Sequence, residues 1–313
     1  MRGRFLGLLV VVGISLFGDY DLKELKILYE NRSPRDGFVA TDFTRSLGHG
    51  SYENGLYRKQ HSCLIPTIER NYYKFCRAVH RKRGSYSVIP KKFHFIWLGS
   101  PMNELRYLII DSWKKFHPDW EFCIWTDSSL SDFKWSDDRL RQLFEEAETW
   151  AEKADILRAV LLFQFGGVYS DLDMICLKNF NQLVDLGIHF FAGIESQPDN
   201  AYPTAISNAL IGSKKGDPII GNLLNNIIKN NDLDKNLGIH IRTATYPLSQ
   251  ALLDYYETDP LLKNVLILPT TYFYPHYFRY ARYATEFIPF IHKETMVVHL
   301  YEGSWKIEKY AIE

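Results

Sequence analysis

The 313-residue sequence has few cysteines and no net charge. Its four cysteines are Cys63, Cys76, Cys123 and Cys176, and no C-x-x-C pair occurs. Their spacing therefore indicates neither a zinc site nor thioredoxin-like chemistry. The 37 Lys and Arg residues balance 37 Asp and Glu residues, so bulk charge predicts no nucleic-acid partner. A G-x-x-x-x-G-K-[ST] motif is also missing, which argues against a P-loop phosphoryl transferase.

Long apolar runs are scarce as well, and the one near the N-terminus is short. Arg2 and Arg4 precede an uncharged run from Phe5 to Phe17. A basic start followed by such a run is typical of an export signal, and a membrane span needs roughly 17 residues or more. We expect residues 1–18 to direct export, giving a secreted or lumenal protein. The alternatives are an uncleaved anchor at residues 5–17, which would give membrane association through the N-terminus, and a buried element. If the chain is exported, Cys63 and Cys76 are able to pair.

The remaining composition is that of a globular protein. Hydrophobic residues make up 46% and charged residues 24% of the chain, which has room for one large core with or without a small satellite domain. Aromatic residues reach 15%, and such rings both build cores and stack on bases and sugars. We expect residues 19–86 to form a mixed, mainly helical region and residues 87–313 to form the principal domain.

A strand, a helix and a second strand follow one another at the start of the principal domain. The strand pattern at 93–99 is followed by a helix that Asn103 caps, and Glu121–Trp125 is the next strand pattern. This βαβ order implies a parallel sheet, and ligands of such sheets bind beyond the carboxyl ends of the strands. Trp97 lies near one of these ends. The sequence therefore predicts an α/β fold.

Two carboxylates at alternate positions follow a glycine pair and a short apolar strand pattern. In an extended chain Asp171 and Asp173 point to the same side while Leu172 points away. Paired carboxylate oxygens suit Mg²⁺ or Mn²⁺ that also holds phosphate oxygens. Two other Asp-x-Asp pairs, at 19/21 and 232/234, have no apolar flanks, and we interpret them as solvated turns.

Two charges interrupt an otherwise apolar helix just before the glycine pair. We expect residues 137–165 to be helical, and the helix is apolar on nearly all sides. Asp155 and Arg158 share one face at a spacing of three residues. Buried charges require partners or a ligand, so the pair is either a structural ion pair or part of a site.

The C-terminal half contains further strand and helix patterns. We expect strands at 190–194, 207–212, 266–269 and 296–300 and helices at 218–229 and 248–256. The aromatic stretch 272–283 is interpreted as packing, with an acceptor rim as the alternative. Asn208 is either a pocket residue or an ordinary amide of a strand. The segment 299–305 ends in Gly303, Ser304 and Trp305, which a turn would present together.

Five blocks of residues 88–305 resemble the DXD sugar-binding-motif glycosyltransferases of the family 32 type. This family is related to the clostridial glucosylating toxins and to mannosyltransferases. The blocks are IPKKFHFIWLG, WEFCIWTD, KADILRAVLLFQFGGVYSDLD, SNALIGSKKGDPII and HLYEGSW. The resemblance implies a GT-A, Rossmann-like nucleotide-sugar fold with a mixed, mainly parallel central sheet. It also implies a divalent metal, Mn²⁺ or Mg²⁺, and transfer of a hexose from a UDP- or GDP-linked donor with retention of configuration.

The resemblance also implies residue roles. Trp97 would stack on the base. Asp155, Arg158 and Asn208 would line the sugar pocket, and Tyr169 with Asp171 would contact the ribose and the sugar. The metal would be held by Asp171, Asp173 and His299, with Ser304 and Trp305 over the diphosphate. One departure is Thr245-Tyr246-Pro247, where relatives have Thr-Gly-Pro. The acceptor, a glycan, a lipid or a protein, stays open. The alternative functions are a nucleotide-sugar hydrolase and an inactive carbohydrate-binding relative.

Overall fold

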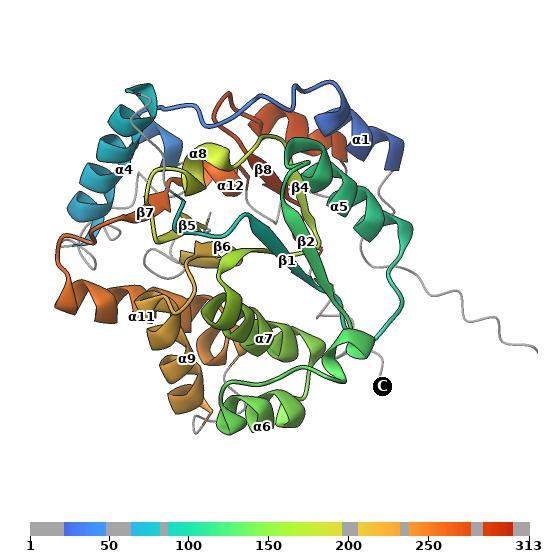
Figure 1. Ribbon diagram of the computed structural model, residues 1–313. Coiled ribbons are helices and arrows are strands. Elements are labelled where there is room, and N and C mark those ends of the chain that lie inside the picture. The colour runs from blue at the N-terminus through green and yellow to red at the C-terminus, as the bar shows by residue number, and fades with distance from the viewer. Residues whose placement is uncertain are drawn as a thin grey trace, which may run out of the picture.

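A six-stranded sheet forms the centre of the computed structural model (Figure 1). The structure describes residues 22–47, 64–81, 87–195, 206–231, 238–276 and 284–302. Several predictions fall outside these ranges, namely those on the N-terminal residues 1–18, the outer Asp-x-Asp pairs, Cys63, Ser304 and Trp305. Within the described ranges, no helix combines the length and the apolar character that a membrane crossing requires.

The central sheet is mixed and mainly parallel, as predicted. Its strands, in spatial order, are β2 (Glu121–Trp125), β1 (Lys92–Ile96), β3 (Gly167–Ser170), β6 (Ile206–Ser213), β5 (Phe190–Ile194) and β7 (Val265–Leu268). Strand β1 is parallel to β2 and β3, and β5 is parallel to β7. Only β6 runs antiparallel to its neighbours in this sheet. The carboxyl ends of β1, β3 and β5 therefore lie at the same edge.

A second, two-stranded sheet joins distant parts of the chain. It pairs β4 (Met174–Cys176) with β8 (Val297–His299) in antiparallel orientation. Strand β4 begins directly after Asp173, and Met174 is paired with His299. This pairing brings the C-terminal part of the described chain beside the predicted metal-binding carboxylates.

Helices cover both faces of the central sheet. In the view of Figure 1, α7, α9 and α11 lie below the sheet, and α1, α4 and α5 lie above it. The helices are α1 (Leu22–Glu30), α4 (Leu64–His80), α5 (Glu104–Phe116), α6 (Asp138–Glu146), α7 (Trp150–Phe165), α8 (Asn181–Val184), α9 (Pro218–Asn230), α10 (Ile239–Arg242), α11 (Thr245–Thr258), α12 (Thr270–Phe273) and α13 (Ala284–Phe287). Short 3-10 turns lie at Arg45–Leu47, Asp127–Leu130 and Ile288–Phe290.

The predicted single helix over residues 137–165 is wrong, because the structure has two. Helix α6 ends at Glu146 and α7 begins at Trp150. Thr149 is extended and forms a capping box with Glu152, in which the Thr149 hydroxyl accepts a hydrogen bond from the Glu152 N–H. Such a box satisfies backbone donors that have no partner at a helix start, so it favours a new helix at this point.

The N-terminal helices share the hydrophobic core of the principal domain. The hydroxyl groups of Tyr72 on α4 and Tyr272 on α12 lie 2.7 Å apart. Asn71 donates a hydrogen bond to the Leu262 carbonyl. Tyr272, Phe273 and Tyr274 are fully buried, which confirms packing as the role of these three rings. Positions 277–283 of the same aromatic stretch lie outside the described residues.

The glycine pair before the Asp-x-Asp motif is required by close backbone contacts. Gly166 and Gly167 both have positive φ angles, 65° and 109°. A Cβ atom on Gly166 would lie 2.5 Å from the Lys215 nitrogen, and one on Gly167 would lie 2.6 Å from the Lys92 carbonyl oxygen. Only glycine adopts this conformation at such close range without strain. The pair therefore turns α7 directly into β3.

Gly212 offers a test of the sheet packing. A Cβ atom there would lie 2.0 Å from the buried Phe191 ring, so Gly212→Ala overpacks the β5–β6 face. We expect a loss of about 1–3 kcal/mol in the free energy of unfolding. Gly238→Ala is the matched control, because no heavy atom lies within 4 Å of its added carbon. Urea unfolding that gives equal midpoints for the two variants would contradict this packing.

Two buried histidines give the fold a predictable pH dependence. Burial lowers the pKa of His117 to about 4, and its ring accepts a hydrogen bond from the Phe180 N–H. Since the unfolded value is near 6.5, stability is full above pH 6.5 and is lost as the pH falls toward 4. The difference between the folded and unfolded pKa values corresponds to about 3 kcal/mol in the free energy of unfolding. The same pH dependence applies to His94, because burial also lowers its pKa to about 4. His117→Gln should flatten, but not abolish, the fall in urea midpoint between pH 7 and pH 4.5.

Candidate active site

A cavity of about 560 Å³ lies over the carboxyl ends of the central strands. Trp97 follows β1, Asp171 follows β3 and Glu195 follows β5, and all three line the cavity. The start of α7 and the end of β8 complete the walls. The cavity therefore occupies the edge of the sheet where the βαβ order predicts a ligand site.

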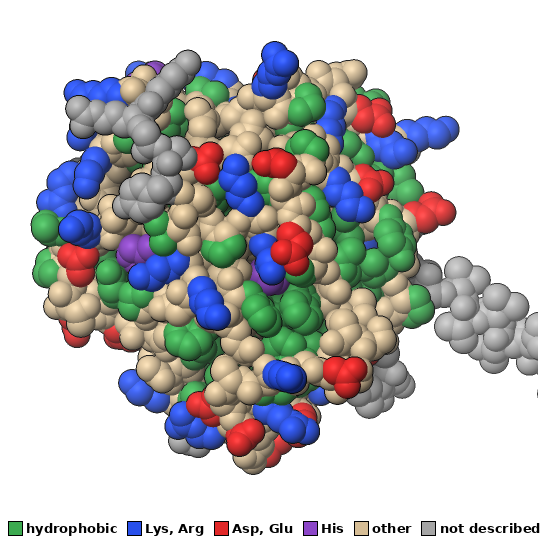
Figure 2. Space-filling view, in the orientation of Figure 1, with side chains coloured by type: hydrophobic (Ala, Val, Ile, Leu, Met, Phe, Trp, Pro, Cys, Tyr) green, Lys and Arg blue, Asp and Glu red, His purple; other side chains and the backbone are tan. Residues whose placement is uncertain are grey.

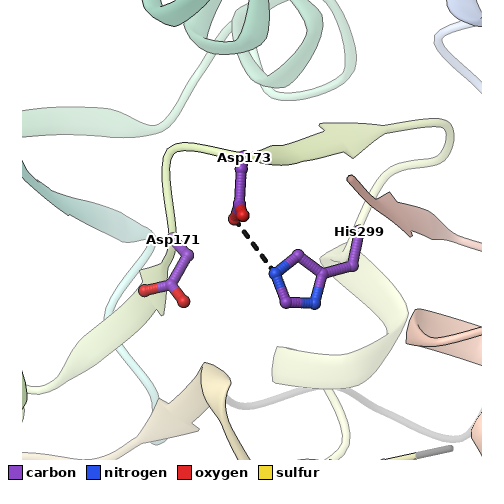
Figure 3. A group of neighbouring side chains, drawn as sticks. All are labelled: Asp171, Asp173 and His299. Carbon is purple, nitrogen blue, oxygen red and sulfur yellow. Dashed lines mark ion pairs between the residues drawn. The ribbon is translucent and has the colours of Figure 1, made fainter. Parts of the chain in front are cut away.

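Asp171, Asp173 and His299 converge on one point of the cavity wall. One ligand atom from each lies within 4.8 Å of the other two. Figure 3 shows the two carboxylates and the imidazole directed toward a common space, with His299 coming from β8. The His299 Nε2 atom lies 3.1 Å from Asp173 Oδ1. Residues 172–173 form a turn, so the carboxylates converge through this turn and not through an extended strand.

The end of β8 and helix α5 fix the turn that carries Asp173. The Leu300 N–H donates to the Asp173 carbonyl at 2.8 Å, and the Glu302 N–H donates to Asp173 Oδ2 at 3.2 Å. Arg106 on α5 donates to the Leu172 carbonyl at 2.8 Å and forms an ion pair with Glu302. The position of the Asp173 carboxylate therefore depends on segments before and after it in the chain.

Asp155 and Arg158 form a second polar group next to the metal cluster. The Asp155 carboxylate accepts hydrogen bonds from Asn208 at 2.9 Å and from the Thr243 hydroxyl at 2.8 Å, and it pairs with Arg158 at 2.8 Å. Arg158 also lies 3.3 Å from Asp171 and donates to the Asn208 carbonyl. Asp155 is thus a structural ion-pair partner and at the same time a residue of the cavity wall.

Tyr169 and Trp97 each have one ring face covered by an arginine. The Arg158 guanidinium lies 4.5 Å from the Tyr169 ring centre, and Arg106 lies 4.5 Å from that of Trp97. The Tyr169 hydroxyl donates to Asp171 Oδ1 at 2.5 Å. Trp97 therefore has one face occupied by Arg106, and base stacking would require its other face.

The carboxylates of the cavity differ in their protonation behaviour. Burial raises the pKa of Asp155 to about 6 and also raises the pKa of Asp171. Burial acts in the same direction on Asp173, but His299 and Arg106 outweigh it, so the pKa of Asp173 is lowered. The pKa of His299 is raised, because Asp173 outweighs the effect of burial. Burial raises the pKa of Glu195 to about 7.

The structure brings together every predicted site residue that it describes. Trp97, Tyr169 and Asn208 line the same cavity as the predicted charged residues Asp155, Arg158, Asp171 and Asp173. Ser304 and Trp305 lie outside the described residues. The sequence analysis missed Arg106, Glu195, Thr243 and Glu302. Arg106 is a charge in the row of Ile109, Ile110 and Trp113, the same signal that singled out Arg158. Glu195 is the first polar residue after an apolar strand, as Asp171 is.

Together, the mainly parallel sheet and the Asp-x-Asp turn at its carboxyl edge define an α/β protein with a cavity that carries a candidate metal-binding cluster. Residues 104–186 match the family described as "Glycosyltransferase sugar-binding region containing DXD motif". This match includes Asp155, Arg158, Asp171 and Asp173. The match agrees with the predicted resemblance of this region to DXD-type glycosyltransferases.

The chain is also similar to curated proteins. It is 30% identical over 142 residues to Inositol phosphoceramide mannosyltransferase 3 of Schizosaccharomyces pombe, a match covering 45% of this chain and 38% of that protein. It is 25% identical over 234 residues to Uncharacterized glycosyltransferase L373 of Acanthamoeba polyphaga mimivirus, covering 70% and 84%. Subversion of eukaryotic traffic protein A of Legionella pneumophila is 27% identical over 164 residues, covering 45% and 25%. The chain thus spans less than half of the first and third of these relatives.

Solved structures with related shapes are glycosyltransferase domains. PaToxG glycosyltransferase is 24% identical with a TM-score of 0.45, and the match covers 64% of this chain and 80% of that one. The UDP-bound glycosyltransferase domain of the YGT toxin is 10% identical with a TM-score of 0.45, covering 59% and 80%.

Arg158 can be tested as the cation that stabilises the cavity wall. Arg158→Met keeps an unbranched apolar stem but leaves Asp155 and Asp171 without their shared cation. Removing one partner of a buried ion pair costs about 3–5 kcal/mol, so we expect a clearly lower unfolding midpoint. Arg139→Met is the control, because it breaks the exposed pair with Asp137 and should leave the midpoint close to native. If Arg158→Met melts like the native protein, Arg158 does not stabilise this wall.

Proposed function

We propose that this chain is a metal-dependent glycosyltransferase that moves a hexose from a nucleotide-sugar donor to an acceptor with retention of configuration. The observation that carries the proposal is the shared cavity. It is lined by the Asp171–Asp173–His299 cluster and by the adjoining Asp155–Arg158–Asn208 group. A nucleotide-sugar has matching parts, namely a diphosphate that binds metal and a sugar that binds hydrogen-bonding side chains.

The donor atoms of the cluster fit a small divalent cation. Two carboxylates and one imidazole within 4.8 Å offer oxygen and nitrogen ligands of the kind that Mn²⁺ accepts, and Mg²⁺ also suits the carboxylates. His299 must be neutral to act as a ligand, so cation binding would displace its proton. A bound divalent cation would act as a Lewis acid that neutralises charge on the leaving diphosphate.

The chain's own residues would position the donor. Arg158 stays charged, because Asp171, Tyr169 and Asp155 raise its pKa although burial acts to lower it. It therefore supplies a fixed positive charge beside the sugar, and the Asn208 amide and the Asp155 carboxylate supply hydrogen-bonding groups. The exposed face of Trp97 would hold the base. If the acceptor attacks from the face that the diphosphate leaves, no side chain need act as a nucleophile.

The names of the relatives support a hexose as the transferred group. Inositol phosphoceramide mannosyltransferases 1, 2 and 3 of Schizosaccharomyces pombe are named for mannose transfer to a lipid. We propose a UDP- or GDP-linked hexose as the donor and a glycan, lipid or protein as the acceptor. The proposed place of action is beyond a membrane, as the pattern of residues 1–18 suggests.

Asp173→Asn tests the metal site directly. The variant removes one ligand charge and keeps the shape of the side chain, so we expect Mn²⁺ affinity to fall by roughly 100-fold or more. Free Mn²⁺ is measured by electron paramagnetic resonance. Nucleotide release from UDP- and GDP-hexoses should fall by roughly 10³-fold or more, since a catalytic metal supplies several kcal/mol.

Asp119→Asn is the control for this experiment. Asp119 is an exposed carboxylate that lies 3.8 Å from Lys91, away from the cluster, so neither measurement should change. Native Mn²⁺ affinity in Asp173→Asn, or full turnover of the native chain in excess chelator, would exclude the metal role. Donor hydrolysis that no acceptor accelerates would identify a hydrolase instead, and absence of turnover would identify a binding protein.

A further inference from the structure

Glu195 is a carboxylate of the cavity to which neither the sequence patterns nor the metal cluster gives a role. It follows β5 directly, and Ile194 of β5 is paired with Ile206 of β6. Glu195 therefore lies beside the start of β6, where Ser207 and Asn208 line the same cavity. Asn208 is the residue that bonds Asp155, so Glu195 neighbours the group assigned above to the sugar.

The Glu195 carboxylate has no hydrogen bond or ion pair among the residues that the structure describes. Other secluded glutamates do have partners. Glu152 pairs with Arg242, Glu302 pairs with Arg106, and Glu294 accepts hydrogen bonds from Ser46 and Thr271. Glu195 is half-buried, so its carboxylate is partly desolvated and has no such partner among the described residues. A hydrogen-bond partner from outside the protein would offset the cost of this partial desolvation.

The chemistry of this partner follows from the groups nearby. A hydroxyl group suits a carboxyl group whose pKa is raised to about 7, because it donates to the ionised form and accepts from the protonated form. The three residues whose ligand atoms lie within 4.8 Å of one another are Asp171, Asp173 and His299, and Glu195 is not one of them. Both His299 and Asp171 act electrostatically on Glu195, which places it near the proposed diphosphate position. A neutral hydroxyl group close to the diphosphate satisfies all three conditions.

We propose that Glu195 binds a hydroxyl group of the sugar that the donor carries. This inference rests on the proposed function, and it makes Glu195 a residue that selects the donor sugar. The sugar is then bound by Asp155, Arg158 and Asn208 together with the neighbouring Glu195. A sugar lacking that hydroxyl leaves the half-buried Glu195 carboxylate without this bond, so the site discriminates against it.

The experiment compares donors with their free diphosphates. The probes are UDP, GDP, UDP-glucose, UDP-galactose, UDP-N-acetylglucosamine and GDP-mannose, titrated calorimetrically with Mn²⁺ into the native chain, Glu195→Gln and Glu294→Gln. We expect Glu195→Gln to weaken binding of the preferred nucleotide-sugar roughly 10-fold, because a neutral amide oxygen replaces the charged acceptor of the hydrogen bond. Affinity for the free diphosphate should not change. Glu294→Gln removes a partnered buried carboxylate outside the cavity and should change neither affinity.

Deoxy analogues of the preferred sugar locate the contact. The analogue that lacks the bound hydroxyl should lose affinity for the native chain and lose little more for Glu195→Gln, since the same bond is removed twice. Thermal unfolding separates this role from a structural one. Glu195→Gln should melt at or above the native temperature, because it removes a half-buried charge that has no partner among the described residues, whereas Glu294→Gln should melt lower.

The outcomes are distinguishable. If no diphosphate and no nucleotide-sugar binds to the native chain, the proposed function fails and the role of Glu195 fails with it. A second outcome is that the native chain binds both while Glu195→Gln lowers the affinities for diphosphate and nucleotide-sugar equally, or lowers neither. In that case the role of Glu195 is overturned while the proposed function stands. A large loss of thermal stability in Glu195→Gln would also overturn it, because Glu195 would then be a structural residue.

Discussion

The geometry of the cavity depends on Arg158, which is buried between two carboxylates. Asp155 and Asp171 would disfavour each other's ionisation if no cation lay near them. Arg158 pairs with both, and its remaining donor capacity reaches the Asn208 carbonyl. The guanidinium also covers the Tyr169 ring, whose hydroxyl bonds Asp171. One charge thus links α7, β3 and β6 beside the metal cluster, and these contacts are made without a ligand.

The metal cluster depends on a different constraint, the pairing of β4 with β8. Asp171 and Asp173 are close in sequence, but His299 is brought to them by a strand more than a hundred residues later. The pairing continues beyond the strands, because Leu300 and Glu302 both donate backbone hydrogen bonds to Asp173. Arg106 then binds Glu302 and the Leu172 carbonyl, which joins α5 to the same turn. The net charge of the molecule contributes little here, and Figure 2 shows acidic and basic side chains interspersed over the face it presents.

Local patterns in the sequence were enough to predict the features that depend on neighbouring residues. The apolar strands, the cap at Asn103 and the charges of α7 are all encoded within a few positions, and the structure confirms them. The split of the helix at Thr149 was encoded locally too, as a Thr-x-x-Glu box, but the strong apolar pattern on its C-terminal side obscured it. The turn at Asp173 shows the limit of such reasoning. The spacing correctly predicted convergence, yet for a reason that applies to strands, whereas the structure achieves it with a turn held by β8. Contacts such as Thr243 with Asp155 need tertiary packing and carry no sequence signal of their own.

The carboxylates of the cavity differ in how many hydrogen-bond and ion-pair partners the protein gives them. Asp155 has a cation, an amide and a hydroxyl as partners, and Asp173 has an imidazole and a backbone N–H. Asp171 pairs with Arg158 and accepts a hydrogen bond from the Tyr169 hydroxyl, and its side chain is still 27% exposed. Glu195 has none of these among the described residues, although burial raises its pKa as it does that of Asp155. The Glu195 side chain is half-buried, and evolution for stability alone would favour an amide there, since an amide has the same shape without the cost of partly desolvating a charge. A carboxylate left in this state at the edge of a sheet, beside a site for charged ligands, is best explained by what it binds.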